Sequence, residues 1–149
     1  MRRSLVIRDL VAANEADWRR LWACYNAFYE AEVPEAVTQA TWSRVQDPGS
    51  GIGGRAAVVE RGLVGFAHYI LNPSTWTLGP TCYLEDLYVD ASARGHGVGG
   101  ALIGDLIGLG VERRWARIYW HTRDGNATAR RLYDRFASAD DFVRYRIVL

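Results

Sequence analysis

The chain has 149 residues, of which 49% are hydrophobic and 23% are charged, and 18 basic and 17 acidic side chains leave a formal net charge of +1. This size and composition predict one globular domain that folds without disulfides or a structural metal. The near-neutral charge argues against a nucleic-acid-binding face, and the lack of an apolar run of about 20 residues argues against a membrane span. Arg8 and Asp9 interrupt the apolar start that a secretory signal needs, so we expect a cytoplasmic protein.

All of the basic residues are arginine, and lysine is absent. This excludes a phosphate-binding loop that closes in Gly-Lys-Ser/Thr. Cys24 and Cys82 match no zinc spacing, and His68, His96 and His121 are too far apart to form a helical ligand pair. We therefore expect no metal site.

The pattern of apolar, glycine and proline residues predicts the following strands and helices. We expect helices over residues 15–29, 38–45, 99–113 and 126–136, with Thr38 capping the second and Pro48 ending it, and a glycine-rich loop over 47–54. We expect strands over residues 5–10, 55–60, 63–70, 81–89, 117–122 and 142–149. Antiparallel strands followed by two strand and helix units predict a mixed α/β sheet with helices on both faces.

Large apolar residues recur at steps of three and four within the first expected helix, which is the period of an amphipathic helix. Core packing explains this stripe better than a ligand-binding role. Its members are Trp18, Leu21, Trp22, Tyr25, Phe28 and Tyr29.

The most informative segment runs from Leu84 to Ile103, where a strand passes through a glycine-rich turn into a helix. The first turn of a helix has free backbone N–H groups and the positive end of the helix dipole. Glycines let phosphate oxygens approach this backbone closely, so the segment suits an anion. A plain turn is the alternative, because glycine alternation after a strand is a weak signal by itself.

The run Arg94-Gly95-His96-Gly97-Val98-Gly99 resembles the pyrophosphate-binding signature Arg-x-x-Gly-x-Gly of the GCN5-related N-acetyltransferase (GNAT) superfamily. The resemblance extends over essentially the whole chain. Residues 83–86, 119–122 and 132–134 are similar to the Hpa2-like and diamine acetyltransferase-like branch. The resemblance implies one GNAT domain over residues 1–149, with a mixed, mostly antiparallel sheet of six to seven strands flanked by about four helices.

The resemblance also implies acetyl-coenzyme A as co-substrate. The expected coenzyme-binding residues are Leu87, Tyr88, Val89, Arg94, Gly95, His96, Gly97, Val98, Gly99, Gly100, Asn126, Ala129 and Tyr133. Three of them keep a second interpretation: Arg94 contributes through its side chain or its backbone, His96 touches phosphate or is a solvated loop residue, and Asn126 contacts the pantetheine arm or caps its helix.

Acyl transfer to an amine needs a base, because an alkyl ammonium with a pKa near ~10.4 is not nucleophilic until it loses a proton. Glu85 and Asp86 are the candidates, and strand alternation predicts that only one of them faces the cleft. The resemblance favours Glu85, acting through water, with an exposed strand acid as the alternative. It also implies that Tyr133 donates a proton to the departing thiolate, although its helical spacing suits core packing as well.

The acceptor wall is expected at the N-terminal helices, where acidic residues would attract a cationic amine. The expected substrate-binding residues are Tyr25, Tyr29, Glu30, Glu32, Glu85 and Asp86. We expect a small primary amine, a polyamine or an amino-acid-like acceptor, with a protein lysine or N-terminus as the alternative. A catalytically inactive sensor that binds acetyl-coenzyme A is an alternative of another class. The apolar strand expected over residues 145–149 predicts a homodimer.

Overall fold

The computed structural model describes residues 4–149 and contains a five-stranded sheet with four α-helices. The strands are β1 (Val6–Asp9), β2 (Ile52–Val59), β3 (Gly62–Asn72), β4 (Thr81–Val89) and β5 (Arg117–Tyr119). The α-helices are α1 (Glu15–Phe28), α2 (Glu35–Gln46), α3 (Val98–Arg113) and α4 (Ala127–Tyr133), and short 3-10 turns η1 (Ala12–Asn14) and η2 (Ala91–Ala93) precede α1 and the glycine loop.

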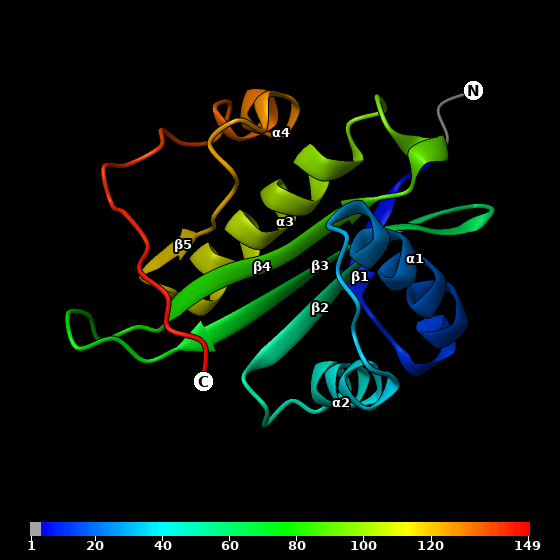
Figure 1. The fold of residues 1–149 in the computed structure, drawn as a ribbon, viewed down its shortest axis with the longest axis horizontal. Coiled ribbons are helices and arrows are strands. Elements are labelled where there is room, and N and C mark those ends of the chain that lie inside the picture. Colours follow the sequence, from blue (N-terminus) through cyan, green and yellow to red (C-terminus); the bar gives the residue numbers. More distant parts are fainter. Residues whose placement is uncertain (1–3) are drawn as a thin grey trace.

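The strands lie in the order β1-β2-β3-β4-β5, antiparallel throughout except for the parallel pair of β4 and β5. Helices α1 and α2 cover one face of the sheet, and α3 and α4 lie on the other (Figure 1). Strand alternation explains the two layers. Phe66 packs into the α1 and α2 core, and the next residue, Ala67, packs into the α3 core.

The α1 core is dominated by Trp18 and Leu21, whose exposed fractions are 0%. Burial of each such side chain contributes about 1.5–3 kcal/mol to folding. Trp22 and Tyr25 pack against this core, and Tyr25 and Tyr29 also line cavities, so the predicted aromatic stripe is core at its start and borders cavities at its end.

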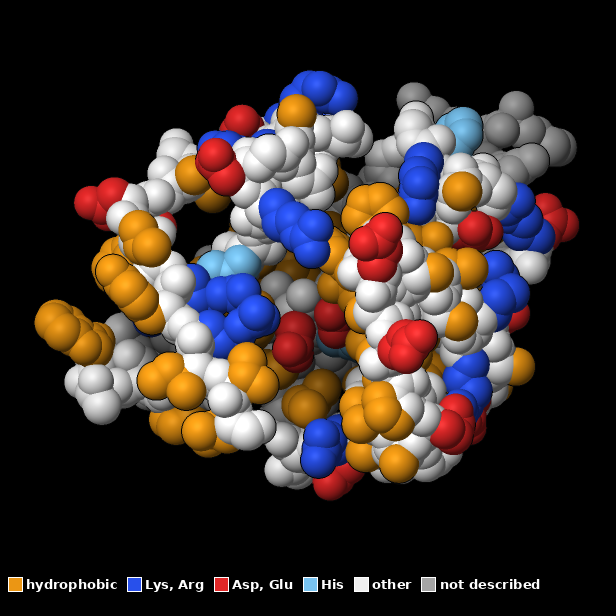
Figure 2. Space-filling model, in the orientation of Figure 1, with side chains coloured by type: hydrophobic (Ala, Val, Ile, Leu, Met, Phe, Trp, Pro, Cys, Tyr) orange, Lys and Arg blue, Asp and Glu red, His pale blue; other side chains and the backbone are white. Residues whose placement is uncertain are grey.

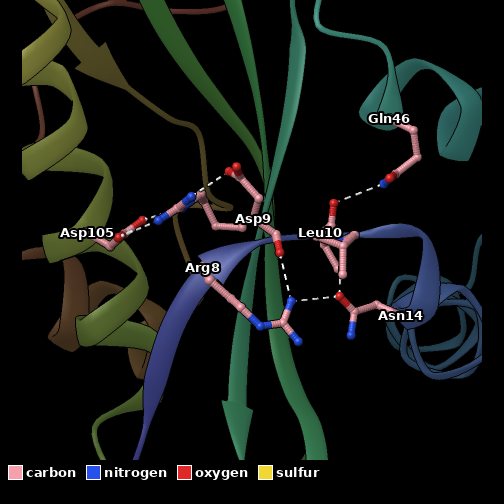
Figure 3. A network of polar contacts seen from close by, with 8 residues as sticks. Arg8, Asp9, Leu10, Asn14, Gln46 and Asp105 are labelled. Atoms are coloured by element: carbon pink, nitrogen blue, oxygen red, sulfur yellow. Dashed lines mark hydrogen bonds and ion pairs between the residues drawn. The ribbon is translucent and has the colours of Figure 1, made fainter.

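A buried arginine joins the sheet to α3. The Nε and Nη2 atoms of Arg55 donate to the two carboxylate oxygens of Asp105 at 2.7 and 2.9 Å, and Nη1 donates to Asp9. Figure 3 shows this pairing together with the contacts on the other face, where the amide of Gln46 donates to the carbonyl of Leu10. The bidentate geometry fixes α3, and hence its N-terminus, relative to the strands.

Strand β4 separates from its parallel neighbour partway along its length. The pairing with β5 covers only Thr81 to Tyr83, whereas the pairing with β3 continues to Val89. Figure 1 shows the chain leaving β5 toward α4 while β4 continues alone on that side. One edge of β4 is thus left without a strand partner beyond Tyr83, within the part of the chain described here.

The expected fold class is confirmed, but the expected count of six to seven strands is wrong, since the described residues form five. The missing strand is the one expected over residues 142–149, which has no strand conformation. A strand requires a paired edge, and this segment pairs with none in the described part of the chain. Its apolar side chains are exposed instead, with Leu149 fully so.

Two smaller expectations about the N-terminal half are also wrong. Thr38 does not cap α2, because the helix already begins after Pro34. Thr38 is an interior residue of α2, and its hydroxyl accepts a hydrogen bond from Nε1 of Trp22 at 3.2 Å. The glycine-rich loop ends earlier than expected, because β2 already begins at Ile52. Gly54 belongs to the strand, where a Cβ atom would lie 2.7 Å from side-chain atoms of Leu10 and Val45.

Among the described residues, none of the helices has the length and apolar character needed to cross a membrane.

Candidate functional site

Two cavities open beside the free end of β4, and Tyr25 of α1 and Tyr29, which follows that helix, line both of them. The first, about 600 Å³ in volume, lies against the glycine loop, and we call it the loop cavity. The second, about 820 Å³, contains Glu85 at an irregularity of β4, and we call it the bulge cavity. The shared tyrosines make the two cavities neighbours.

The loop cavity brings together nearly all of the residues expected to hold acetyl-coenzyme A. The predicted coenzyme-binding residues that line it are Leu87, Tyr88, Val89, Arg94, Gly95, Gly97, Val98, Gly99, Gly100, Asn126, Ala129 and Tyr133. His96 is the exception and lies exposed on the loop. Phe28, Ala93, Thr128, Leu132 and Arg135 complete the lining.

Backbone groups dominate the charge-binding part of the loop cavity. Gly95 and Gly97 both have φ of +79°, a conformation that other residues rarely adopt, and Gly97 is the N-cap of α3. A Cβ at either position would meet no atom within 4 Å. Glycine is therefore required there by the backbone conformation and not by a lack of space. The first N–H groups of α3 therefore face an open cavity, which is an arrangement that binds anions.

The Arg94 side chain contacts the strand that precedes this loop. Its Nε atom donates to the carbonyl oxygen of Val89 at 3.1 Å, and its guanidinium lies 5.6 Å from the centre of the Tyr88 ring. Asn126 caps α4, because its Oδ1 accepts from the N–H of Ala129 at 3.3 Å. The capping interpretation of Asn126 is thus confirmed, and the residue also lines the loop cavity.

An irregular register in β4 corrects the expectation that Glu85 and Asp86 point to opposite faces. His68 of β3 pairs with Asp86 and the next residue, Tyr69, pairs with Leu84, so Glu85 is an extra residue, a β-bulge. A bulge shifts the alternation by one position. Leu84 and Leu87 both pack into the α3 core, which places the two acids between them on the α1 side.

Asp86 belongs to a buried chain of hydrogen bonds that reaches α1. Its Oδ2 lies 2.9 Å from Nδ1 of His68, and Nε2 of His68 lies 2.9 Å from Nε1 of Trp18. An indole N–H can only donate, so Nε2 accepts and Nδ1 carries the hydrogen that is donated to Asp86. The His68 side chain is 2% exposed and that of Asp86 13%, so the contact fixes the carboxylate in place.

The acids and tyrosines here influence one another strongly. Burial, followed by repulsion from Asp86, raises the pKa of Glu85 above its ordinary value. Burial also raises the pKa of Tyr25, and the charges of Asp86 and Glu85 raise it further. A base with a raised pKa beside a phenol that stays protonated is an arrangement suited to proton transfer.

Tyr133 is the last residue of α4 and faces the loop cavity, half-buried, with its ring 5.5 Å from that of Trp120. Burial, with a smaller effect of Tyr29, raises the pKa of its phenol. The hydroxyl therefore carries its proton at neutral pH. Its ring also packs against the α3 core, as the helical spacing predicts, and its role as a proton donor stays a prediction.

Three of the expected acceptor residues line neither cavity: Asp86, which is held by His68, and Glu30 and Glu32. Glu30 and Glu32 are exposed and line neither cavity, because α1 ends before them and the chain turns away. Glu35 is paired with Arg19 through an Nη1 to Oε1 contact of 2.7 Å. The acids that line the site are Glu85 of β4 and Asp140 of the C-terminal segment, and the loop after α1 contributes none.

The bulge cavity also contains residues for which the sequence predicted no role in the site. Tyr83 and Tyr119, opposite each other on β4 and β5, have rings 5.2 Å apart, and His121 Nδ1 lies 3.2 Å from the Tyr83 hydroxyl. The remaining lining is Arg117, Trp120, Thr122, Arg123, Asp140, Phe142, Val143 and Arg144. The period-two spacing of Tyr83 and Glu85 was the available signal, whereas nothing local marks the arginines.

No group of three or more His, Cys, Asp or Glu side chains suited to a metal ion occurs among residues 4–149.

Comparisons with known proteins give a consistent result. The chain is 33% identical over 144 residues to the D-amino-acid N-acetyltransferase HPA3 of Saccharomyces cerevisiae, covering 95% of this chain and 89% of that enzyme. It is 31% identical over 78 residues to the thialysine N-epsilon-acetyltransferase of Bos taurus, covering 52% of this chain and 45% of that enzyme. These relatives are named acetyltransferases.

Solved structures agree in fold. The ribosomal-protein-alanine N-acetyltransferase of Brucella melitensis biovar Abortus 2308 superimposes with a TM-score of 0.79 at 25% identity, covering 98% of this chain and 100% of that one. An aminoglycoside acetyltransferase from an uncultured soil metagenomic sample gives 0.82 at 17% identity, covering 97% and 96%. The model of the acetyltransferase (GNAT) family matches residues 16–137. The chain belongs to the GNAT family of acetyltransferases.

Proposed function

We propose that this chain, as a single catalytic domain, transfers the acetyl group of acetyl-coenzyme A to a small primary amine by direct attack in a ternary complex. The observation that carries the proposal is the bulge of β4. It places Glu85 in a cavity that adjoins, through Tyr25 and Tyr29, the cavity formed by the glycine loop.

The loop cavity fits acetyl-coenzyme A, whose thioester supplies the activated acetyl group. The pyrophosphate would lie at the loop from Arg94 to Gly100, where the N–H groups of α3 are free. The extended pantetheine arm would lie along the unpaired edge of β4 at Leu87 to Val89, and Asn126 and Ala129 of α4 close the other side.

In the transfer, Glu85 takes a proton from the bound ammonium through a water molecule. The free amine then forms a C–N bond to the acetyl carbon as the C–S bond breaks. A backbone N–H near Tyr88 on the free β4 edge stabilises the negative charge that develops on the carbonyl oxygen. Tyr133 donates its proton to the departing thiolate, because a phenol with a raised pKa still holds that proton at neutral pH. The acylated nitrogen loses its second proton, which restores the phenol, and the proton held by Glu85 is released to solvent.

A small acceptor is favoured over a protein chain because residues of the C-terminal segment line the bulge cavity and narrow it. The names of the relatives, which refer to D-amino acids and to thialysine, support an acceptor of the same size. A protein lysine or N-terminus remains the second candidate acceptor.

The test is thiol release from acetyl-coenzyme A with a panel of amines, paired with calorimetric titration of coenzyme A. We expect coenzyme binding together with amine-dependent thiol release. Binding without turnover for any amine would overturn the proposal in favour of a sensor that binds acetyl-coenzyme A.

The predicted homodimer has lost the strand on which it was based. Exposed apolar side chains at Phe142, Tyr145, Ile147 and Leu149 leave a surface suited to self-association. Light scattering at working concentration checks it, and a monomer mass would remove the prediction.

A further inference from the structure

Three arginine side chains line the bulge cavity together with Glu85. Arg117 begins β5, Arg123 lies between β5 and α4, and Arg144 belongs to the C-terminal segment. Over residues 4–149, none of the three forms an ion pair with a carboxylate. Their donors are therefore available to a ligand.

Aromatic rings support two of these guanidinium groups. Arg123 lies 5.9 Å from the centre of the Tyr29 ring, and Arg117 lies 5.5 Å from the centre of the Tyr119 ring. Contact with a ring face restrains a guanidinium while leaving its edge free to donate. The cavity thus holds two positioned cationic groups on the side formed by β5 and its following loop.

The carboxylates in this cavity do not balance the arginines. Glu85 and Asp140 are the acids that line it, and Oδ1 of Asp140 accepts a hydrogen bond from the N–H of Phe142 at 3.2 Å. Figure 2 shows acidic side chains recessed in the hollow in the middle of the drawn face and basic side chains gathered beside them. The cavity therefore holds three arginines against two acids, and Glu85 is the acid contributed by β4.

The phenol of Tyr83 lies within range of both charges. Burial raises its pKa, Glu85 raises it further, and Arg144 acts in the opposite direction. Tyr83 stacks on Tyr119, whose ring is also the one that Arg117 contacts. One small ligand lying over these rings would reach both groups.

A polyamine does not suit this arrangement, because its further ammonium groups would lie beside the arginines. A molecule with one ammonium and one carboxylate matches both charges. We propose that Arg117, Arg123 and Arg144 form a carboxylate subsite, so that the acceptor is an amino acid with a free carboxylate. The planar guanidinium offers two parallel donors that match a carboxylate. This inference rests on the proposed acetyl transfer, because Glu85 marks where the amine reacts.

The first experiment compares alanine with alaninamide, and phenylalanine with phenylalaninamide, each as the D and L forms, in thiol release by the unaltered protein. Each pair differs only in the carboxylate. The amine of an amide loses its proton more readily than that of the free amino acid, so amine reactivity favours the amide. We expect kcat/KM at least about 10-fold higher for the free amino acid of the preferred form, as for one charge-assisted contact.

The second experiment uses Arg117→Gln, Arg123→Gln, Arg144→Gln and the triple variant. We expect the triple variant to raise KM for the amino acid about 100-fold and to change KM for its amide less than twofold. Arg44→Gln on α2 is the matched control, since Arg44 is exposed and lines neither cavity. It should alter neither substrate's KM.

The outcomes separate the two proposals. Equal turnover of amino acids and amides would overturn the carboxylate subsite while acetyl transfer stands. Failure of every amine to release thiol would overturn the transfer itself. If a variant loses both substrates, coenzyme A titration shows whether its loop cavity is intact, and the comparison of acids with amides in the unaltered protein then decides.

Discussion

The loop cavity and the bulge cavity differ in where their lining residues lie in the sequence. One continuous stretch, the end of β4, the glycine loop and the start of α3, supplies the glycines of the loop cavity, and α1 and α4 with their flanking residues line its other sides. The bulge cavity contains no glycine among the described residues and is lined by α1, β4, β5, the residues that follow α1 and β5, and the C-terminal segment. A site made of backbone needs particular conformations and leaves a glycine pattern, whereas a site made of side chains from distant segments leaves no local pattern.

Glu85→Gln tests the bulge cavity at its reacting group. We expect kcat to fall about 100- to 10,000-fold, because the ammonium loses its proton acceptor. Coenzyme A affinity should stay the same, since Glu85 does not line the loop cavity. The melting temperature should hold or rise, because the substitution removes a charge that repels Asp86. Retained turnover would reduce Glu85 to an exposed strand acid.

Tyr133→Phe tests the loop cavity at the thiolate. We expect kcat to fall about 10- to 1,000-fold with coenzyme affinity largely unchanged, because the variant keeps the ring and loses only the hydroxyl that donates the proton. Steady-state kinetics and calorimetry measure the two quantities. Unchanged turnover would leave Tyr133 with packing alone.

The pH profile distinguishes the base from the acid. Glu85 works in its ionised form, and its pKa is raised, so kcat should fall about tenfold per unit as pH drops below that pKa. The phenol of Tyr133 works protonated and its pKa is also raised, so no loss from it is expected near neutral pH. If kcat of the Glu85→Gln variant still falls at low pH with the same midpoint, the fall comes from the titration of another group.

His68 positions Asp86, and two substitutions separate that role from general packing. His68→Asn keeps an amide donor near the position of Nδ1, whereas His68→Leu removes it, and both lose the acceptor for Trp18. We expect His68→Leu to lower kcat/KM for the amine about 10-fold, with substantial recovery in His68→Asn and no change in coenzyme affinity. Equal losses in both variants would indicate packing alone.

Gly97→Ala tests the backbone of the loop cavity and has the smallest expected effect. Its φ of +79° disfavours any side chain, so we expect the free energy of unfolding to fall by about 1 kcal/mol and coenzyme affinity to drop several-fold. Gly104→Ala is the matched control, an exposed position within α3 with open space, where about 0.5–1 kcal/mol of added stability is expected. Denaturant titration should show a lower free energy of unfolding for Gly97→Ala and a higher one for Gly104→Ala.

Sequence reasoning worked where the evidence was local. Strand β4 has the predicted bounds, and α3 begins one residue before its predicted start. It failed where a residue's direction depends on a partner strand. The bulge at Glu85 exists because β3 pairs with β4 in a shifted register, so alternation along β4 alone gave the wrong face for one acid.

The sequence by itself determined the fold class and the glycine loop, because these follow from the hydrophobic period and from backbone conformations that glycine permits. The family was predicted from the resemblance of the run from Arg94 to Gly99 to a known signature, and the family model that matches residues 16–137 shows it. Only the tertiary structure decided that Glu85 and Asp86 share a side, that His68 fixes Asp86, and that Arg144 reaches the same cavity as Glu85. The physical reason is that side chains far apart in sequence meet only through strand register and chain path, which neighbouring residues do not specify.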